Sequence, residues 1–375
     1  MPLPPPAFPL GTPASGRDLV GRDEAVAELA LRLSTGQHLL LFGPRRTGKT
    51  SVAEAALARL RAGGLLGARV DLTYTPSKRA LADALAGACL QVAGTGFRAL
   101  EQLRAALASV RPELRLRREL GPEAAEFVLG LARPDTRPDA EDEVLRSALA
   151  LPERVAATRG RRAILCLDEF QEAGRIDTGI YRLIRAEISA QRHTTYLFMG
   201  SQGSLLSGLF ARRNEPLYQF ATVWSLPPVP AEAWTAYLAA RYAEAGLSTT
   251  AAGLDALLAA SGAHPMHTML LAQEAAVLAL TDRGVVDADI AGAARASAAR
   301  ALAPAFEEVW RSLPAPAQTA LILLSRGDSP WTGRGSRTTK RAMDALLDRG
   351  ILVRAGRGRY RFFETMFEEF VRGIA

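Results

Sequence analysis

A glycine-rich segment with a single lysine is the first feature of the sequence that points to chemistry. Residues 43–50 read GPRRTGKT, which fits the spacing G-x-x-x-x-G-K-[ST]. Glycines let such a loop curl until its main-chain N–H groups converge on phosphate oxygens, and the amino end of a following helix adds partial positive charge. The chain has lysine at only three positions, 49, 78 and 340, and one of them falls here. A compact ammonium acts on phosphates as a point charge, whereas a guanidinium prefers a planar fork.

This loop predicts a nucleotide site with ATP and Mg²⁺ as cofactors. Lys49 is expected to bridge the β- and γ-phosphates, and Thr50 to hold Mg²⁺ through its hydroxyl. A glycine-rich turn with an incidental lysine is the alternative, but a strand-like run precedes the loop and a helix-like run follows it. The other candidate nucleotide ligands are the rest of the loop and the first helical turn: Gly43, Pro44, Arg45, Arg46, Thr47, Gly48 and Ser51.

An apolar run that ends in two acids supplies the second element expected of a nucleotide hydrolase. The run is AILCLDEFQE at 163–172. Asp168 is predicted to bind the magnesium shell, and Glu169 to polarise the attacking water as general base. A strand that ends in two solvated acids is the alternative. Adjacent acids favour hydrolysis over transfer to a small acceptor, so a kinase is a weaker hypothesis.

Polar residues also follow the strand predicted at 194–199. Ser201 is the first choice, and Gln202 the second, for a side chain that positions water or contacts the γ-phosphate. An ordinary turn explains the same residues without any chemistry.

Two further segments are candidates for the adenine side of the site. A glycine turn enters a helix before the phosphate loop, although a helix start alone explains it; its residues are Val20, Gly21 and Arg22. A later helix begins at His264 and Pro265, close to His267. Because no cysteine or cluster of acids lies beside these histidines, a packing or adenine-side role is more plausible than a metal site.

The elements that position these residues are short apolar runs alternating with helical patterns. Strands are predicted at 38–42, 67–72, 163–167, 194–199 and 221–226. Short all-apolar strands separated by helices predict a parallel sheet covered on both faces. Helices are predicted at 22–34, 47–61 and 178–191, mostly helical structure over 77–160, Ala-rich helices from 229 to about 300, and a hairpin at 351–355 and 359–363.

Composition describes a globular chain rather than a membrane or disulfide-rich one. The 375 residues are 48% hydrophobic and 23% charged, enough for two or three domains with sizeable cores. Cys89 and Cys166 lie in apolar surroundings and cannot form a disulfide framework, so a reducing, cytoplasmic location is expected. No apolar run approaches the roughly 18 residues of a membrane span, and the first ten residues lack the basic region of a secretory signal.

The positive charge is concentrated near the carboxyl end. Residues 326–361 carry the whole formal net charge of +7, which suggests a polyanionic partner. A helix predicted at 338–349 and the hairpin after it present the basic residues: Arg337, Lys340, Arg341, Arg354, Arg357, Arg359 and Arg361. DNA contact is one interpretation. Protein docking or a solvated surface is the other, because Lys340 and Arg341 can pair with Asp344 within the helix.

Together these segments resemble the archaeal-type ATPase family, in the AAA-like, STAND-type branch of P-loop ATPases. The resemblance spans roughly 19–372 and is carried by LVGRDEAVAEL (19–29), GPRRTGKTS (43–51), ILCLDEFQE (164–172), LFMGS (197–201), EPLYQFATVWSLPPV (215–229) and GAHPMHTMLLAQEA (262–275). It implies an α/β fold, with a P-loop NTPase core and five-stranded parallel sheet, then an α-helical lid and a winged helix. The domains expected are a disordered Pro-rich tail at 1–18, the core at 19–228 with an insertion at 77–160, the lid at 229–302 and the winged helix at 303–375.

The resemblance implies an ATPase that acts as a nucleotide-driven switch, with DNA or a protein as partner and a possible nucleotide-dependent oligomer. Val20–Arg22 would border the base, and the turn at 262–265 would close over it. Members of the family often read Pro-Leu-Tyr-Gly-Arg where this chain has Gln219 and Phe220 after Pro-Leu-Tyr. The nearby Arg212 and Arg213 are the substitutes expected for the missing arginine, and slow or partner-dependent hydrolysis is the alternative.

Overall fold

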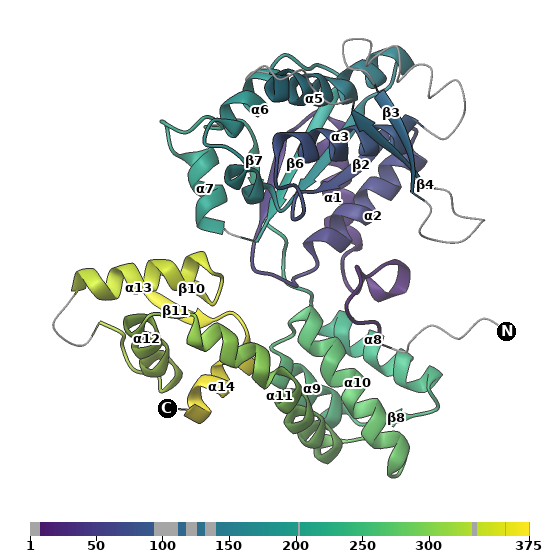
Figure 1. The fold of residues 1–375 in the computed structure, drawn as a ribbon. Coiled ribbons are helices and arrows are strands. Elements are labelled where there is room, and N and C mark those ends of the chain that lie inside the picture. The colour runs from purple at the N-terminus through teal and green to yellow at the C-terminus, as the bar shows by residue number, and fades with distance from the viewer. Residues whose placement is uncertain are drawn as a thin grey trace.

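A five-stranded parallel sheet forms the centre of the amino-terminal half. The computed structural model describes residues 8–93, 112–117, 126–131, 140–201, 203–331, 336–356 and 358–374. All neighbouring strands of the sheet run parallel, so the carboxyl ends of β1, β5 and β6 meet at one edge (Figure 1). The predicted sheet is confirmed, in the order β2-β5-β6-β1-β7, with strands β1 (Leu39–Phe42), β2 (Leu66–Asp71), β5 (Ala163–Asp168), β6 (Thr194–Gly200) and β7 (Thr222–Trp224).

Helices cover both faces of this sheet. Leu39 and Leu41 pack on one face with α1 (Asp23–Ser34) and α2 (Lys49–Ala62), whereas Leu40 points to the other face. Strands buried on both sides need apolar residues at successive positions, which explains the unbroken apolar runs. The second face is covered by α3 (Lys78–Ala93), α5 (Ala140–Arg159), η2 (Phe170–Arg175), α6 (Ile180–Ile188) and α7 (Gly203–Ala211).

The insertion at 77–160, predicted to be mostly helical, also contains two strands that were not predicted. Between α3 and α5 it carries an antiparallel pair, β3 (Pro112–Arg117) and β4 (Glu126–Leu131). Leu114 and Leu116 alternate with charged residues in β3, which is the two-residue period of a strand.

A helical region follows β7 and occupies the lower right of Figure 1. Two strands of two residues each, β8 (Ser248–Thr249) and β9 (Val285–Val286), pair in parallel within a segment that was predicted to be purely helical. The helices are α8 (Ala231–Glu244), α9 (Ala251–Ser261), α10 (Pro265–Thr281) and α11 (Ala288–Arg311). The expected boundary between 302 and 303 therefore falls inside α11.

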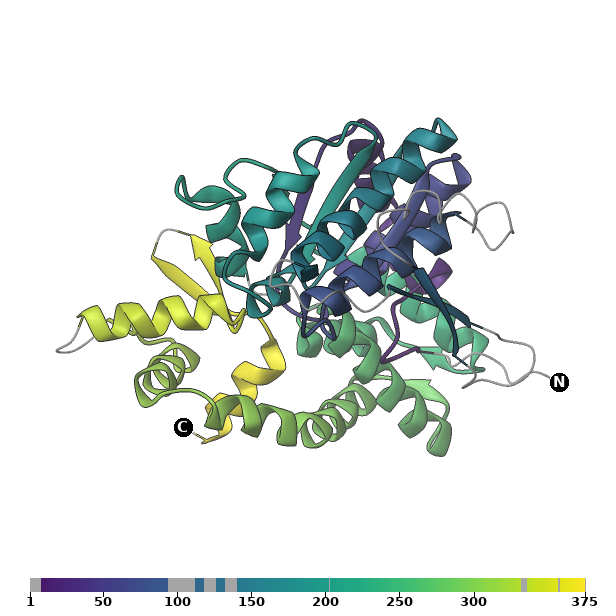
Figure 2. The same cartoon turned by 45° about the horizontal axis from the view of Figure 1, so that its top comes forward.

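The carboxyl-terminal region consists of helices around a two-stranded hairpin. Its elements are α12 (Ala315–Ser325), α13 (Ser336–Asp348), β10 (Leu352–Gly356), β11 (Arg359–Phe362) and α14 (Thr365–Ile374). The predicted hairpin is confirmed, but α14 was not predicted. Side chains of α14 share one hydrophobic cluster with the helices of the preceding region, so the two regions have a common core. Figure 2 shows the hairpin beside the amino-terminal core.

Residues 8–18 of the tail, expected to be either disordered or wrapped on the protein, lie against α8. Phe8 is buried, and its ring centroid lies 5.0 Å from that of Tyr242 on α8. The short helix η1 (Gly16–Asp18) follows, and Asp18 accepts a hydrogen bond of 2.7 Å from the hydroxyl of Tyr237. These contacts hold the segment against α8; residues 1–7 lie outside the described part.

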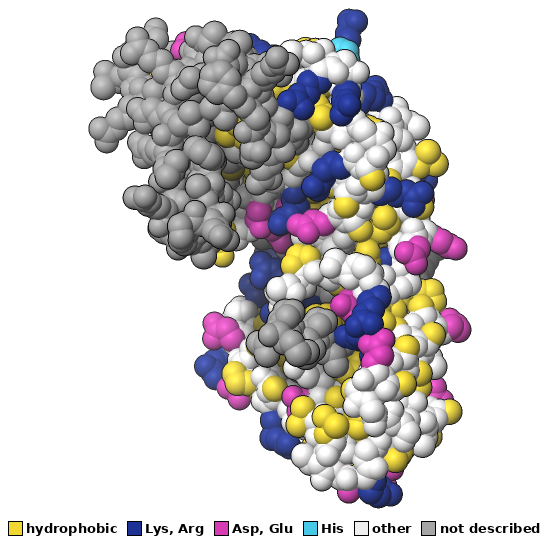
Figure 3. Space-filling view, turned by 90° about the vertical axis from the view of Figure 1, so that its right-hand side faces the viewer, with side chains coloured by type: hydrophobic (Ala, Val, Ile, Leu, Met, Phe, Trp, Pro, Cys, Tyr) yellow, Lys and Arg dark blue, Asp and Glu magenta, His cyan; other side chains and the backbone are white. Residues whose placement is uncertain are grey.

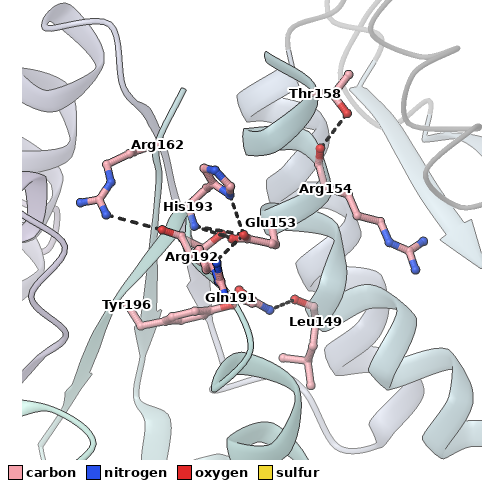
Figure 4. A network of polar contacts seen from close by, with 10 residues as sticks. Leu149, Glu153, Arg154, Thr158, Arg162, Gln191, Arg192, His193 and Tyr196 are labelled. Carbon is pink, nitrogen blue, oxygen red and sulfur yellow. Dashed lines mark hydrogen bonds and ion pairs between the residues drawn. The ribbon is translucent and has the colours of Figure 1, made fainter. Parts of the chain in front are cut away.

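At the amino-terminal edge of the sheet, Glu153 fastens α5 to the start of β6 (Figure 4). Its carboxylate accepts hydrogen bonds from the main-chain N–H groups of Arg192 and His193 and from the Thr194 hydroxyl, at 2.9–3.0 Å. These bonds, together with the His193 ring, hold the pKa of Glu153 below its usual value although burial raises it. Among the described residues, no helix is both long and apolar enough to cross a membrane.

Candidate functional site

The GPRRTGKT loop connects β1 to α2 at the carboxyl edge of the sheet. Gly48 has φ 90°, a left-handed conformation that glycine adopts without strain, and it is the N-cap of α2. Arg46 also has a positive φ of 63°. No side chain caps the amino end of α2, so its first-turn N–H groups remain free to bind an anion.

Lys49 is buried inside this loop, with 7% of its surface exposed. Its Nζ donates hydrogen bonds to the carbonyl oxygens of Gly43 at 2.9 Å and of Pro44 at 2.6 Å. Burial lowers the pKa of Lys49 to about 8, and the nearby carboxylates of Glu169 and Asp168 partly oppose that shift. The ammonium is therefore bound by loop carbonyls rather than paired directly with an acid, and it lies where phosphates would meet the loop.

Thr50 and Asp168 meet as a metal site requires. The Thr50 hydroxyl donates to Oδ2 of Asp168 at 3.0 Å. Burial raises the pKa of Asp168, while the bond from Thr50 and the charge of Arg69, 3.2 Å from the same oxygen, counteract the rise. A hydroxyl and a carboxylate are the hard oxygen ligands that Mg²⁺ takes, so these two side chains fit the predicted ion.

Glu169 is held against the end of the neighbouring strand. It has φ 49°, which turns its side chain off the line of β5. Oε2 accepts hydrogen bonds from the Ser201 N–H at 3.3 Å, the Ser201 hydroxyl at 3.0 Å and the Gln171 amide. The structure thus brings Ser201 to the proposed general base, whereas Gln202 lies outside the described residues.

On the other side of the loop, Arg22 connects the loop to the start of the helical region. Its guanidinium donates to the carbonyl oxygens of Thr47, at 3.1 Å, and of Pro227. It is 4% exposed, and burial lowers its pKa to about 10. Val20 packs with the helical region, and Gly21, at φ 61°, lies against its first residues. The predicted adenine-side turn therefore adjoins both the loop and the helical region.

His264 caps α10 at the turn predicted to close over the base, just before Pro265. Its ring accepts a hydrogen bond of 3.5 Å from the His267 N–H, and the two ring centroids lie 4.6 Å apart. His264 is buried, which lowers its pKa to about 4. The charge of Glu364 and the main chain of Arg45 partly oppose that shift, so this turn lies beside the phosphate loop.

Arg46 and Ser51, two other predicted nucleotide ligands, contact different segments of the chain rather than each other or the acids of the site. Nη1 of Arg46 lies 3.0 Å from Sδ of Met266 on α10. The Ser51 hydroxyl accepts a hydrogen bond of 2.9 Å from the N–H of Ala14 in the amino-terminal segment. Both contacts connect the loop to parts of the chain outside the sheet.

A cleft of about 700 Å³ opens between the loop and the carboxyl-terminal region. Arg212 lines it together with Ser201, whereas Arg213 is exposed outside it. Gly350, at the end of α13, lies against Pro44 of the loop. Further residues of the cleft are Phe42, Gly43, Leu205, Glu215, Asp344, Leu347, Asp348 and Arg354.

Phe220 occupies the position where the family pattern has arginine, and it faces inward. Its ring stacks on His38 at 4.8 Å between centroids, and the Arg185 guanidinium lies 4.1 Å above it. Gln219 has φ 54°, a conformation that suits the glycine of that pattern. An arginine at this position is thus replaced by a packing residue, which leaves Arg212 as the arginine near Ser201.

The predicted DNA-binding residues are exposed, except Arg357, which lies outside the described residues. In the described part of the chain none of the six forms an ion pair, so the predicted pairing of Lys340 and Arg341 with Asp344 is absent. Their charge is therefore not neutralised locally. The six are Arg337, Lys340, Arg341, Arg354, Arg359 and Arg361.

Two residues at the site were missed in the sequence. Gln171 follows Glu169 by two positions, and its place in the DEFQE run was the available signal. Arg69 is a charged residue in the middle of β2, between apolar neighbours at 68 and 70, which is unusual enough to mark it. Its contact with Asp168 depends on the pairing of β2 with β5, and this register is not visible in either segment alone.

No model of a protein family matches the sequence, and no curated protein matches it. Solved structures, in contrast, match the fold of this chain. A Walker-type ATPase of Pyrococcus abyssi matches with a TM-score of 0.68 and 16% identity, over 98% of this chain and 99% of that one. The ORC2 protein of Aeropyrum pernix, in ADPNP–ADP complexes, matches with a TM-score of 0.57 and 15% identity, over 98% and 96%. The resemblance inferred from the sequence is confirmed at the level of the fold: over nearly its whole length, this chain has the fold of an archaeal Walker-type ATPase.

Proposed function

We propose that this protein is a Mg²⁺-dependent ATPase that works as a nucleotide-driven switch. The observation that carries the proposal is the meeting of Lys49, the Asp168–Glu169 pair and Ser201 at the carboxyl ends of β1, β5 and β6. These residues are distant in sequence, and a nucleotide hydrolase needs all of them around one γ-phosphate. The shared fold with a Walker-type ATPase supports the same conclusion.

Each side chain has a role that its surroundings support. The N–H groups at the start of α2 and the Lys49 ammonium would bind the phosphates. Thr50 and Asp168 would hold Mg²⁺, which neutralises charge on the phosphates when bound. Glu169 would take a proton from the water that attacks the γ-phosphorus in line, and Ser201 would orient Glu169 and that water.

The contacts of Lys49 and Glu169 favour conditional activity. Lys49 donates to the carbonyls of Gly43 and Pro44, and it must leave them to reach a triphosphate. Glu169 is bound by Ser201 and Gln171, and it must turn from them to face a water. Because Phe220 stands where the family pattern has an arginine, stabilisation of the negative charge in the transition state would depend on Arg212 or on a partner. We therefore expect ATP turnover that is slow or that depends on a partner.

The loop contacts both the helical region and the carboxyl-terminal region, which supports a switch. Arg46 contacts α10, Arg22 joins the loop to the segment before α8, and Gly350 rests on Pro44. A triphosphate that moves the loop therefore acts at once on the lid and on the carboxyl-terminal region. The output would be a change in the angle between these parts.

DNA is the partner we propose for the carboxyl-terminal region, acting as a winged helix. Its helix–helix–hairpin order and its unpaired arginines support insertion of α13 in a groove with the hairpin along phosphates. The face of the molecule away from α13 mixes basic, acidic and apolar side chains over its described part (Figure 3). By the sequence, the net positive charge lies in residues 326–361, the segment that contains α13 and the hairpin.

Docking of a protein is a second candidate, favoured by a specific contact. Asp344, Leu347 and Arg354 of the carboxyl-terminal region line the cleft against α7. The same surface therefore already packs on protein within this chain, and a partner protein with a similar surface would compete for it.

The glutamate at the end of β5 provides the test. Glu169→Gln keeps the shape of the side chain and removes the base, so phosphate release should fall by about 10²–10⁴-fold while ATP affinity stays within a factor of about three. Glu172→Gln, one turn further along and paired with Arg175, is the matched control and should keep wild-type turnover. Unchanged turnover in Glu169→Gln would remove the general base from the proposal.

A further inference from the structure

Arg69 lies among three carboxylates at the edge of the proposed site. Its Nε lies 3.0 Å from Oε1 of Glu54 on α2. Its Nη1 lies 3.2 Å from Oδ2 of Asp168 and 3.5 Å from Oδ2 of Asp71. Asp71 and Asp168 are direct neighbours in the pairing of β2 with β5, so the sheet register itself brings the two acids together.

The guanidinium shares an oxygen with the side chain assigned to the metal. Oδ2 of Asp168 accepts from the Thr50 hydroxyl at 3.0 Å and is in contact with Arg69. Thr50 and Asp168 are the two residues proposed to hold Mg²⁺. The positive charge of Arg69 is therefore positioned within the coordination surroundings of that ion, and the two repel each other strongly at such a distance.

Without Arg69 the carboxylates of Glu54, Asp71 and Asp168 would lose the cation that contacts all three. In the described part of the chain no three acids are placed to hold one metal ion, so the hard oxygen ligands that Mg²⁺ or Mn²⁺ would find here are those of Thr50 and Asp168. Uncompensated acids at this separation also repel one another, so a cation is needed to keep them together. In this structure that cation is the Arg69 side chain.

We propose that Arg69 is a positioning residue that balances these acids and prevents a divalent ion from binding before the nucleotide. The inference rests on the proposed function, because that function assigns Thr50 and Asp168 to the metal. Glu54 and Asp71 keep the guanidinium in place when Oδ2 of Asp168 turns to the ion. The phosphates supply the additional negative charge, so metal enters together with nucleotide rather than ahead of it.

Titration of the nucleotide-free protein with Mn²⁺, followed by the electron paramagnetic resonance of free Mn²⁺, tests the proposal. Arg69→Gln should bind Mn²⁺ about 100-fold more tightly than wild type, because one full positive charge beside the ion is removed. Arg69→Lys keeps the charge and should stay near wild type. Arg61→Gln, an arginine of α2 that bonds the carbonyl of Leu57, is the matched control. In Arg69→Gln/Asp168→Asn the gained binding should disappear.

Two outcomes overturn the proposal. One is equal Mn²⁺ affinity in wild type and Arg69→Gln; the other is gained binding that survives the Asp168 substitution. If circular dichroism shows that Arg69→Gln is unfolded, Arg69→Met, which is also uncharged but keeps a long side-chain stem, takes its place with the same expected gain in Mn²⁺ binding. ATP affinity of wild type is measured in parallel. If wild type does not bind ATP but Arg69→Gln still gains Mn²⁺ binding, the proposed function is wrong. The charge balance by Arg69 is then still supported.

Discussion

Gly350, at the turn between α13 and β10, lies directly against Pro44 of the phosphate loop. A Cβ added at Gly350 would be 3.4 Å from Cβ of Pro44 and 3.5 Å from its Cα. The region that carries the candidate DNA contacts therefore touches the loop that carries Lys49. Movement of either one must be accommodated by the other.

Replacing Gly350 by leucine should loosen this contact and speed the release of nucleotide. Both Gly350 (φ 69°) and Gly358 (φ 73°) adopt left-handed conformations, so leucine at either position costs about 1–3 kcal/mol of strain. Only the side chain at 350 meets the loop, because nothing lies within 4 Å of a Cβ at 358. Stopped-flow release of a fluorescent ADP analogue should be about threefold faster or more in Gly350→Leu. If Gly350→Leu and Gly358→Leu release the ADP analogue at equal rates, the contact between Gly350 and Pro44 does not control nucleotide release.

His264 should make the folded protein less stable in mild acid. Burial lowers its pKa from 6.5 to about 4, so between these values the unfolded chain binds a proton that the folded chain does not. Stability is then complete above pH 6.5 and falls as the pH drops toward 4, by about 2 kcal/mol at pH 5. Asparagine can keep the cap of α10 but does not titrate.

Urea denaturation at pH 7 and pH 5 is the measurement for this histidine. His264→Asn should lose less free energy of unfolding than wild type between these pH values. His193→Asn alters a half-exposed ring at the opposite edge of the sheet and should keep the wild-type pH dependence. Identical pH dependence in all three proteins would exclude His264 as the cause.

The hairpin arginines should make DNA binding sensitive to salt. Arg359 and Arg361 are exposed on β11 and form no ion pair in the described part of the chain. In the double variant Arg359→Ala/Arg361→Ala, the slope of log affinity against log salt should fall by about 0.9 for each phosphate that the variant no longer neutralises. Arg311→Ala, an exposed arginine paired with Glu307, is the control. Absent DNA binding, or a slope of zero in wild type, favours the protein-docking alternative.

Residues whose roles depend on local sequence could be predicted. The loop needs glycine at 48 because φ is 90° there, and this requirement is visible as a motif. Asp168, Glu169 and Ser201 follow buried strands, and parallel strands bring their carboxyl ends to one edge. The sheet and the meeting of these side chains could therefore be inferred without coordinates.

Residues whose roles depend on strand register or on long-range packing could not be predicted from the sequence. Arg69 reaches Asp168 only because β2 pairs with β5 in one register. Phe8 is buried by α8, more than 200 residues away in the chain, which no local pattern reveals. The α14 helix is different: Met366, Phe367 and Val371 form an apolar face, and this periodicity was present in the sequence but was not used.

Nucleotide affinity of Lys49→Ala tests most directly the central claim that the loop amides and one ammonium bind a triphosphate. Calorimetric titration with a non-hydrolysable ATP analogue should give about 100-fold weaker binding than wild type, because charge-assisted hydrogen bonds to the phosphates are removed. Lys340→Ala, which removes an exposed lysine of α13, should bind like wild type. Equal affinity in Lys49→Ala and wild type would contradict the claim.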